Sequence, residues 1–260
     1  DLLCVCTALH THPMDDAGSE AGTPRATKEE RIRAQRALQD KQQKKTFTRW
    51  WKTYLLQNDK TLVIKDLFED IKPGVIGIKL MEVLSGKQSP KFNKNPKTRF
   101  AKLENQGTFL KLVAKDVKLV NIGPEDLFEG KSTLVLGLSW SLILYYEIQK
   151  FGADEQQLLR WCRAKTANYP SVSIPSWGQG FNDGKAFCAL IHRHDPDALD
   201  HAAASQQSPM AALTLAFELA EQRYGVPKLL EPQDLAGGGS FDDDDDANTP
   251  PIKGSARATT

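Results

Sequence analysis

An internal repeat constrains the fold of this chain more than any other feature of its sequence. With an offset of 110 residues, identical residues recur in the pairs Trp51/Trp161, Ile64/Ile174, Gly74/Gly184 and Leu80/Leu190. With an offset of 108 residues, they recur in the pairs Phe109/Phe217, Pro124/Pro232, Asp126/Asp234 and Leu127/Leu235. Chance rarely produces a set of identical pairs that run in the same order and include Trp, Gly, Pro and Phe. The sequence therefore predicts two copies of one unit, with a two-residue deletion in the second.

The hydrophobic spacing predicts that the repeated unit is all-α. A stripe with helical spacing begins near Lys44 and contains Phe47, Trp50, Trp51, Tyr54 and Leu55. Residues 66–85 predict a short helical turn broken at Pro73-Gly74, followed by a second helix that ends at Gly86. Further helices are expected over 103–113 and 134–148, and the second of these is apolar on all sides, as a buried central helix would be.

The repeat also indicates which aromatic and sulfur-containing side chains belong to the core. Because Trp51 has a counterpart in Trp161, we expect Trp51 in the core and Trp50 nearer the surface. Trp140 is expected in the core or in a packing contact with the second copy. The apolar helical patterns around Cys162 and Cys188 indicate packing rather than a nucleophilic role.

We divide the chain into a disordered, partly helical tail (1–42), a first domain (43–150), a second domain (154–236) and an acidic disordered tail (237–260). The second domain has no counterpart of the helix at 134–148, because a Gly-rich stretch and five Asp follow Leu235. Each apolar side chain in such a helix is worth about 1.5–3 kcal/mol. We therefore expect an apolar groove there, left by truncation or filled by a partner, with truncation preferred. Its expected border is formed by Phe187, Leu190, Ile191 and Phe217.

Net charge is distributed unevenly between the two copies. The chain as a whole has a formal net charge of +1, but residues 43–150 contain 19 basic and 11 acidic residues, a net charge of +8. Residues 151–236 contain 7 basic and 10 acidic residues, a net charge of −3. This asymmetry predicts an acidic partner for the first copy. The longest apolar run is 15 residues, shorter than a membrane-spanning helix, and the sparse cysteines favour the cytosol.

Several segments resemble the calponin-homology domains of the actin-binding region in the spectrin, α-actinin and filamin superfamily. KKTFTRWW at 44–51, DLFEDIKPGVIGIKLMEVLSG at 66–86 and the segment 117–148 are similar to a first such domain. LLRWCRAKTANYPSV at 158–172, FNDGKAFCALIHRHDPDALD at 181–200 and YGVPKLLEPQDL at 224–235 are similar to a second. The resemblance covers about 43–235 in order and implies two helical domains in tandem.

The resemblance implies a cytoplasmic, non-catalytic module that binds F-actin in a cytoskeletal cross-linker or membrane-skeleton protein, without a cofactor or metal. The first domain would supply most of the affinity, and the second would modulate it by closing against the first. The family's actin-contacting segments map onto 44–55, 131–148 and 154–165. The candidate contact residues are Lys44, Lys45, Thr46, Phe47, Arg49, Trp50, Lys52, Thr53, Lys131, Thr133, Leu134, Leu138, Ser141, Leu158, Arg160 and Lys165.

A basic edge beside an apolar stripe in 44–55 agrees with an acidic filament as partner, independently of the resemblance. The alternative function is a calponin-homology adaptor for microtubules or signalling partners. In relatives, part of the second domain binds phosphoinositide, for which the candidates are Lys165, His192, Arg193 and His194. The chain departs from the pattern there, because Pro170, Asn182 and Asp195 stand where basic residues are frequent. His192 and His194 are more simply explained by capping or packing.

Other functions have weaker signals. The basic stretch from Lys87 to Lys102 contains no acid and is open to three interpretations: a solvated loop, a filament contact or an anionic lipid contact. Nucleic acid is not expected, because only Phe92 and Phe100 are available for stacking. The Cys and His residues of 4–12 lack a zinc-site spacing, and the Asp run at 242–246 fails the EF-hand pattern. No enzyme motif is present.

Overall fold

The computed structural model describes residues 28–58, 62–149, 152, 154–177 and 179–236, and within these it is helical and contains no strand. The chain divides into two compact units, and the division falls between Leu158 and Leu159, within one helix. Each unit is described by itself and is named by its position in the sequence as the N-terminal or the C-terminal unit. The expected tails at 1–27 and 237–260 lie outside the described residues. No helix in the described part is long and apolar enough to cross a membrane.

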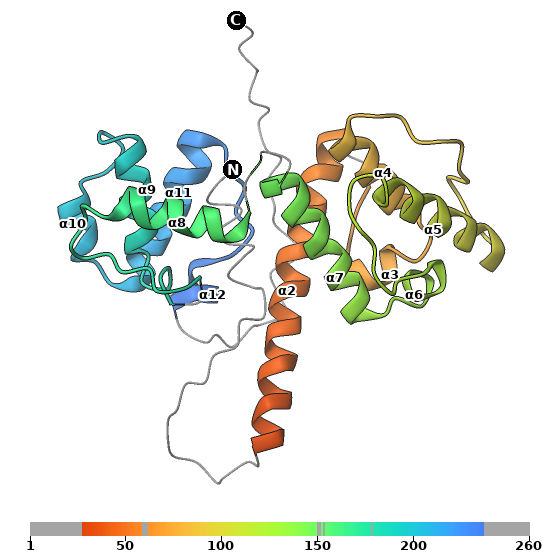
Figure 1. The fold of residues 1–260 in the computed structure, drawn as a ribbon, viewed down its shortest axis with the longest axis horizontal. Coiled ribbons are helices and arrows are strands. Elements are labelled where there is room, and N and C mark those ends of the chain that lie inside the picture. The colour runs from red at the N-terminus through yellow and green to blue at the C-terminus, as the bar shows by residue number, and fades with distance from the viewer. Residues whose placement is uncertain (1–27, 59–61, 150–151, 153, 178, 237–260) are drawn as a thin grey trace, which may run out of the picture. The chain divides into compact units, whose positions relative to one another are not determined.

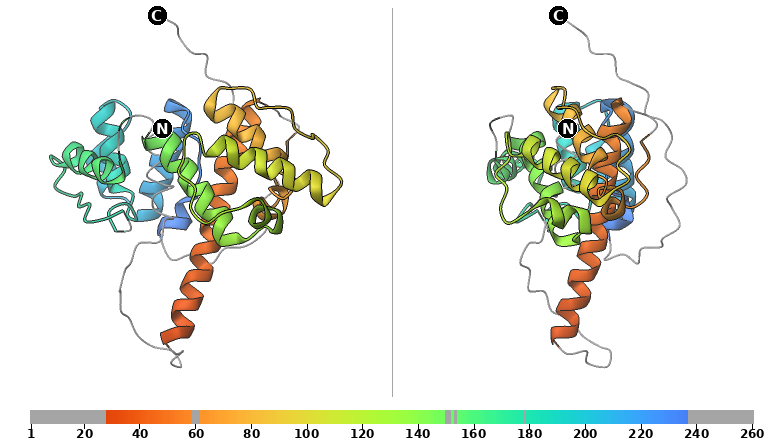
Figure 2. Two further views of the ribbon diagram at one scale, coloured as in Figure 1. Left: turned by 45° about the vertical axis from the view of Figure 1, so that its right-hand side comes forward. Right: turned by 90° about the vertical axis from the view of Figure 1, so that its right-hand side faces the viewer.

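The N-terminal unit is organised around a long helix, α2 (Lys28–Asn58), which is red to orange in Figure 1. The remaining elements are α3 (Leu67–Asp70), α4 (Val75–Ser85), α5 (Arg99–Val113), α6 (Pro124–Glu129) and α7 (Ser132–Ile143), which continues as a π-helical turn at Leu144–Ile148. Helix α2 packs against α4 and α7, and α5 packs against α4 and α6. The two further views in Figure 2 show α7 beside α2 and α5 on the side of α4.

Helix α2 departs from the predicted boundary at residue 42. A partly helical tail that ends at residue 42 and a separate helix from near Lys44 were expected, whereas the structure has one uninterrupted helix from Lys28 to Asn58. No Pro or Gly occurs in this segment, so nothing in it stops helix propagation. The expected break at Pro73-Gly74 is confirmed, with α3 before it and α4 after it. Helix α5 begins four residues before the expected start, because the Thr98 side chain accepts a hydrogen bond from Ala101 N and caps it.

The core of the N-terminal unit contains two polar side chains of α5 that the sequence did not identify. Gln106 is fully buried, and its Nε2 donates to the carbonyl oxygen of Ile71 at 2.6 Å. The Asn105 side chain donates to the carbonyl oxygens of Pro73 at 3.0 Å and of Asn93 at 2.8 Å. These hydrogen bonds satisfy carbonyl groups that no helix satisfies, and they fix the α3–α4 turn and the α4–α5 loop to α5.

The C-terminal unit contains α8 (Glu155–Thr166), which begins just before the division, α9 (Lys185–His194), α10 (His201–Ser205), α11 (Pro209–Tyr224) and α12 (Pro232–Ala236). Helix α9 packs against α10 and α11, and α11 packs against α12. Cys162 and Cys188 are buried free thiols, and burial raises the pKa of Cys188 to about 11, which fits the expected packing role. Among the described residues no helix follows α12, the position at which a counterpart of α7 would start.

An apolar groove was expected in the C-terminal unit, with four residues on its border. All four residues expected on its border are buried: Phe187, Leu190, Ile191 and Phe217. Side chains within the unit account for part of this burial. Phe187 contacts Phe217 edge to face, with 5.6 Å between the ring centroids, and on its other side contacts Phe181 at 4.9 Å. Packing of α9 against α11 thus places these rings in the interior of the unit.

Repetition of the two units is visible in local geometry as well as in sequence. Gly74 and Gly184 precede α4 and α9 with φ angles of +76° and +75°. Asp126 and Asp234 each accept a hydrogen bond of 2.8 Å from the backbone N–H three residues earlier, at the start of α6 and α12. Equivalent residues in the two copies of the repeat therefore have the same structural role at the starts of their helices.

Candidate functional site

Two of the three candidate segments, 44–55 and 131–148, are brought together within the N-terminal unit. They belong to α2 and α7, which lie side by side (Figure 1). The Phe47 ring stacks on Trp140, with 6.5 Å between the centroids. Trp51 Nε1 donates to Ser139 Oγ at 3.0 Å, and this hydrogen bond is buried. The contact is therefore an interlocked aromatic seam and not a loose approach of two helices.

Glu147 closes the C-terminal end of this seam. Its Oε1 accepts a hydrogen bond of 2.9 Å from Trp50 Nε1 and a second one from the Tyr54 hydroxyl. Glu147 lies in the π-helical turn that follows α7. Sequence reasoning missed this residue, although it left a signal, since Glu147 is the single charged residue between Ser132 and Ile148. A carboxylate in such an apolar run needs donors, and the two aromatic side chains of α2 supply them.

The expectation that Trp50 lies nearer the surface is wrong. Both Trp50 and Trp51 are 0% exposed, whereas Trp161 in the C-terminal unit is 42% exposed. Trp50 is buried because its indole N–H has a partner in Glu147, which lies 97 residues further along the chain. Trp140, expected in the core or against the second copy, is half-buried against α2 of its own unit.

Five candidate contact residues are buried, so in this structure their side chains build the interior of a unit. These residues are Thr46, Phe47, Trp50, Leu138 and Leu158. The candidates with exposed side chains are Lys131, Thr133, Arg160 and Lys165. The half-buried candidates are Lys44, Lys45, Arg49, Lys52, Thr53, Leu134 and Ser141. Arg160 and Lys165 lie on α8 in the C-terminal unit.

Helix α7 presents an outward stripe with helical spacing. Thr133 and Gly137 are exposed, and Ser141 one turn further is half-buried. Helix α7 therefore has an outward face and an inward face, because the apolar residues between these positions, Val135, Leu138 and Leu142, are buried. The small and polar side chains at this spacing project little from the helix, so another molecule can approach the backbone of α7 closely. Figure 2 shows α7, in green, along one side of the unit.

Two lysines frame this α2–α7 region and are paired with carboxylates. Lys44 Nζ lies 2.7 Å from Asp66 Oδ2 and 4.8 Å from the centre of the Phe68 ring. Lys131 Nζ lies 2.7 Å from Asp126 and 3.4 Å from Glu129. The hydrogen bonds that Lys131 donates to these two carboxylates raise the pKa of Lys131 above its ordinary value. Lys45, Arg49 and Lys52 also take part in interactions within the chain. The basic edge predicted from the sequence is thus integrated into the fold.

Two of the four candidate phosphoinositide residues, His192 and His194, contact aromatic rings in the C-terminal unit. His192 Nδ1 is 2.7 Å from the Tyr169 hydroxyl, and Tyr169 contacts His201 with 4.5 Å between the ring centroids. His194 contacts Tyr224 edge to face. These contacts agree with the packing role expected for both histidines. Arg193 is exposed, and Lys165 lies with its Nζ 5.8 Å from the centre of the exposed Trp161 ring.

Lowering the pH through the histidine range is expected to destabilise the C-terminal unit. Burial and the neighbouring His192 lower the pKa of His201, against the opposing effect of Asp200. The folded state then binds fewer protons than the unfolded state, so stability falls as the pH drops below about 6.5. Thermal unfolding at pH values on either side of this range measures the loss. It should shrink in His201→Gln but persist in His194→Gln, and an equal loss in His201→Gln would contradict the prediction.

The described residues offer no cluster of side chains for binding a metal ion. Among them, no group of three or more His, Cys, Asp or Glu is placed to hold a metal ion. The candidate zinc residues at 4–12 and the Asp run at 242–246 fall outside the described part of the chain.

Comparison with known proteins identifies the family. The model of the calponin homology (CH) domain matches residues 41–148 and again residues 152–242. Sarcomeric α-actinin from Drosophila melanogaster is 40% identical over 201 residues, which cover 75% of this chain and 21% of that protein. The α-actinin-like protein 1 of Schizosaccharomyces pombe is 38% identical over 199 residues, covering 74% of this chain and 32% of the relative. The chain thus spans between about a fifth and a third of the length of these relatives.

A solved structure shows the same fold. The actin-crosslinking core of Schizosaccharomyces pombe fimbrin superposes with a TM-score of 0.61 at 19% identity, and the match covers 76% of this chain and 44% of that one. At this identity the likeness concerns the fold alone. The two family matches coincide in order with the two copies of the repeat. The chain therefore belongs to the calponin homology family and contains two CH domains in tandem.

Proposed function

We propose that this chain is an actin-filament-binding module of a cytoskeletal cross-linker or membrane-skeleton protein, and that it acts without catalysis. The observation that carries the proposal is the seam between α2 and α7, which holds two candidate contact segments against each other. Relatives named α-actinin, and a fold shared with a protein named for actin crosslinking, support the choice of partner.

The N-terminal unit is proposed to supply most of the affinity. Its repeat copy has a net charge of +8, which would attract an acidic filament over a distance of about 10 Å at ordinary ionic strength. The stripe of Thr133, Gly137 and Ser141 on α7 would then dock, because small side chains allow close approach. The second copy of the repeat has a net charge of −3 over residues 151–236 and lacks this attraction, so the C-terminal unit would only modulate binding.

Opposite charges placed at Thr133 test the proposed docking face. Thr133 is exposed in the first turn of α7, where Glu is favourable for the helix, so Thr133→Glu should fold normally. Repulsion from an acidic filament is expected to weaken co-sedimentation with F-actin about fivefold at low salt, and less at high salt. Thr133→Lys, at the same site with the opposite charge, should bind at least as well as the unmodified chain.

The pair of variants separates charge from shape. If both weaken binding equally, the site tolerates no larger side chain and the electrostatic part of the proposal fails. If neither changes binding, α7 is not the contact. Co-sedimentation with microtubules is the parallel measurement, because binding to microtubules instead of F-actin would support the adaptor function. Reversals at Lys45 and Arg49 are less informative, since both residues also interact within the chain.

A further inference from the structure

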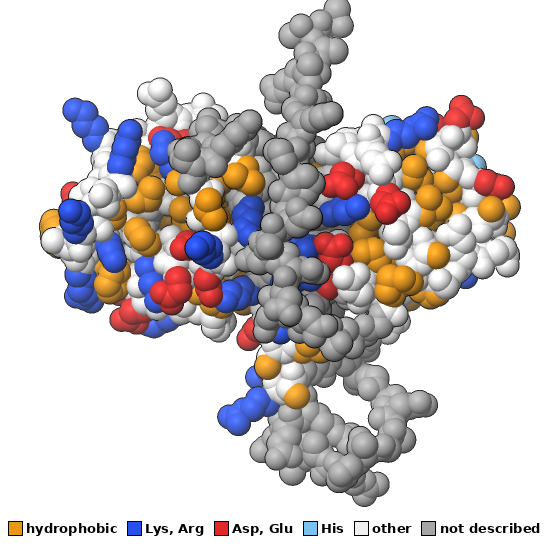
Figure 3. All heavy atoms as spheres, turned by 180° about the vertical axis from the view of Figure 1, so that it is seen from behind, with side chains coloured by type: hydrophobic (Ala, Val, Ile, Leu, Met, Phe, Trp, Pro, Cys, Tyr) orange, Lys and Arg blue, Asp and Glu red, His pale blue; other side chains and the backbone are white. Residues whose placement is uncertain are grey.

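A second basic surface lies on the N-terminal unit, on the loop between α4 and α5 and on the first turn of α5. We call it the lysine face. From Gly86 to Leu103 the sequence has six basic residues and no acid: Lys87, Lys91, Lys94, Lys97, Arg99 and Lys102. All but Lys102, which is half-buried, are exposed. Figure 3 shows Lys and Arg side chains gathered along the outer edge of this unit, at the left of that view.

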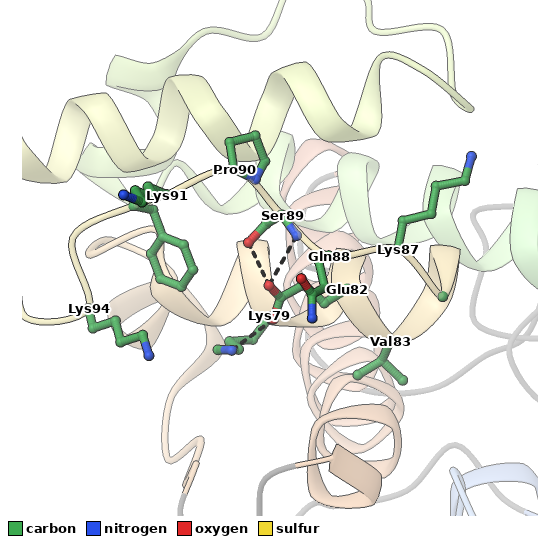
Figure 4. Close-up of a pocket in the computed structure, with 11 residues that line it drawn as sticks. Lys79, Glu82, Val83, Lys87, Gln88, Ser89, Pro90, Lys91 and Lys94 are labelled. Atoms are coloured by element: carbon green, nitrogen blue, oxygen red, sulfur yellow. Dashed lines mark hydrogen bonds and ion pairs between the residues drawn. The ribbon is translucent and has the colours of Figure 1, made fainter.

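The lysine face contains a groove of about 830 Å³ between the end of α4 and the loop. Figure 4 shows that its single carboxylate, Glu82, is engaged. Glu82 accepts hydrogen bonds from Lys79 Nζ at 2.7 Å, Ser89 Oγ at 2.5 Å and Ser89 N at 3.2 Å. Within the described residues, the side chains of Lys87, Lys91 and Lys94 form no ion pair. The groove is therefore positively charged, and Glu82 neutralises only Lys79.

The backbone that holds these lysines is fixed in place. Asn105, which is buried, accepts a hydrogen bond from Asn93 N at 3.1 Å and donates to Asn93 O at 2.8 Å. Ser89 anchors the start of the loop to Glu82, and Thr98 caps α5 at its end. A loop pinned at three points orders its lysines before any ligand arrives, which reduces the entropy lost on binding.

An exposed aromatic side chain accompanies the positive charge. Phe100 is 76% exposed in the first turn of α5, next to Arg99 and two residues before Lys102. Figures 1 and 2 show this end of α5 at the edge of the unit, away from α2. An aromatic ring that is held in water among cations has no role in the core of its own unit. Aromatic and basic side chains together are typical of surfaces that bind at a membrane interface.

We propose that the lysine face binds the surface of a bilayer rich in anionic phospholipid, independently of the α2–α7 region. The lysines contact lipid phosphates, and Phe100 inserts its ring at the headgroup level. A soluble polyphosphate would use the lysines but would leave Phe100 in water. A nucleic acid would need stacking partners, and Phe92, the other aromatic residue here, is half-buried with Lys79 Nζ 5.7 Å from its ring centre.

Vesicle co-sedimentation of the full 260-residue chain tests this proposal. Binding is expected to vesicles of phosphatidylcholine mixed with phosphatidylserine, and not to phosphatidylcholine alone. The double variant Lys91→Glu/Lys94→Glu should bind at least about 30-fold more weakly at low salt. The matched control Lys115→Glu/Lys118→Glu reverses two exposed lysines outside the lysine face and should bind normally.

Phe100→Ala separates a bilayer from other anions. It should weaken vesicle binding about fivefold, whereas Val63→Ala, at another exposed apolar residue of the same unit, should not. If only the lysine variant loses vesicle binding, the Phe100 ring does not insert into the bilayer. The lysine face then binds a phosphate group through its positive charge alone. Equal vesicle binding by all variants would overturn the proposal. So would a loss of F-actin binding by the lysine variant with vesicle binding intact, which would assign this face to the filament.

Discussion

Replacing Trp51 with Ala is expected to lower the free energy of unfolding of the N-terminal unit by about 3–5 kcal/mol. The Trp51 side chain is fully buried, contacts Phe109 edge to face at 6.2 Å, and donates its indole N–H to Ser139 Oγ. Its loss leaves a cavity between α2, α5 and α7. Urea unfolding of the full chain measures the effect, and hydrogen exchange of α5 amides assigns it to this unit.

Trp161→Ala is the matched control, since Trp161 is the repeat counterpart by sequence but is 42% exposed. We expect a cost below about 1 kcal/mol. Trp51→Phe isolates the hydrogen bond. Ser139 Oγ keeps its bond to the carbonyl oxygen of Val135 at 2.8 Å, so only the donor is lost, at about 1–2 kcal/mol beyond the change in packing. Similar losses in Trp51→Ala and Trp161→Ala would refute the assignment of the seam as the core of the N-terminal unit.

The different fates of Trp51 and Trp161 show where a sequence repeat stops predicting structure. Phe47, Trp51 and Leu55 are among the buried positions on α2, and Leu158, Cys162 and Thr166 are the buried positions on α8. In this helix an offset of 111 superposes these buried positions, and it also matches the identical pairs Arg49/Arg160 and Trp50/Trp161, which the offset of 110 does not. One residue on a helix corresponds to a rotation of about 100°, so Trp161 does not face the way that Trp51 does.

The features that were predicted best from the sequence are those that depend on local backbone conformation. Helix limits at Gly74 and Gly86 follow from the left-handed conformation that Gly adopts, and both are observed. Trp50 was misplaced because its partner Glu147 is distant in sequence. The burial of the residues expected on the groove border was missed because packing between α9 and α11 is a tertiary property. Buried Asn105 and Gln106 were missed for the same reason, since polar residues in a helix predict exposure unless the acceptors are known.

Gly74→Ala is expected to destabilise the N-terminal unit by about 1–3 kcal/mol more than Gly86→Ala does. Both glycines have a positive φ, +76° and +69°, so both substitutions carry the same backbone cost of about 1–2 kcal/mol. The two sites differ in the space available for an added Cβ atom. A Cβ on Gly74 would lie 2.7 Å from the Cβ of Asn105 and 2.9 Å from Gln106 N, whereas nothing lies within 4 Å of one on Gly86.

The comparison isolates the close approach of the α3–α4 turn to α5, because the effect of Ala on the unfolded chain is the same at both sites. Thermal unfolding measures both variants, and hydrogen exchange of α5 amides should increase only in Gly74→Ala. Gly184→Ala tests the equivalent position in the second copy of the repeat. A Cβ on Gly184 would lie 2.7 Å from Leu213 N, so this substitution should destabilise the C-terminal unit instead. Equal costs at Gly74 and Gly86 would mean that α5 can move away freely. The hydrogen bonds from Asn105 and Gln106 would then not fix the turn, and the lysine face that Asn105 holds at Asn93 would lose its rigid base.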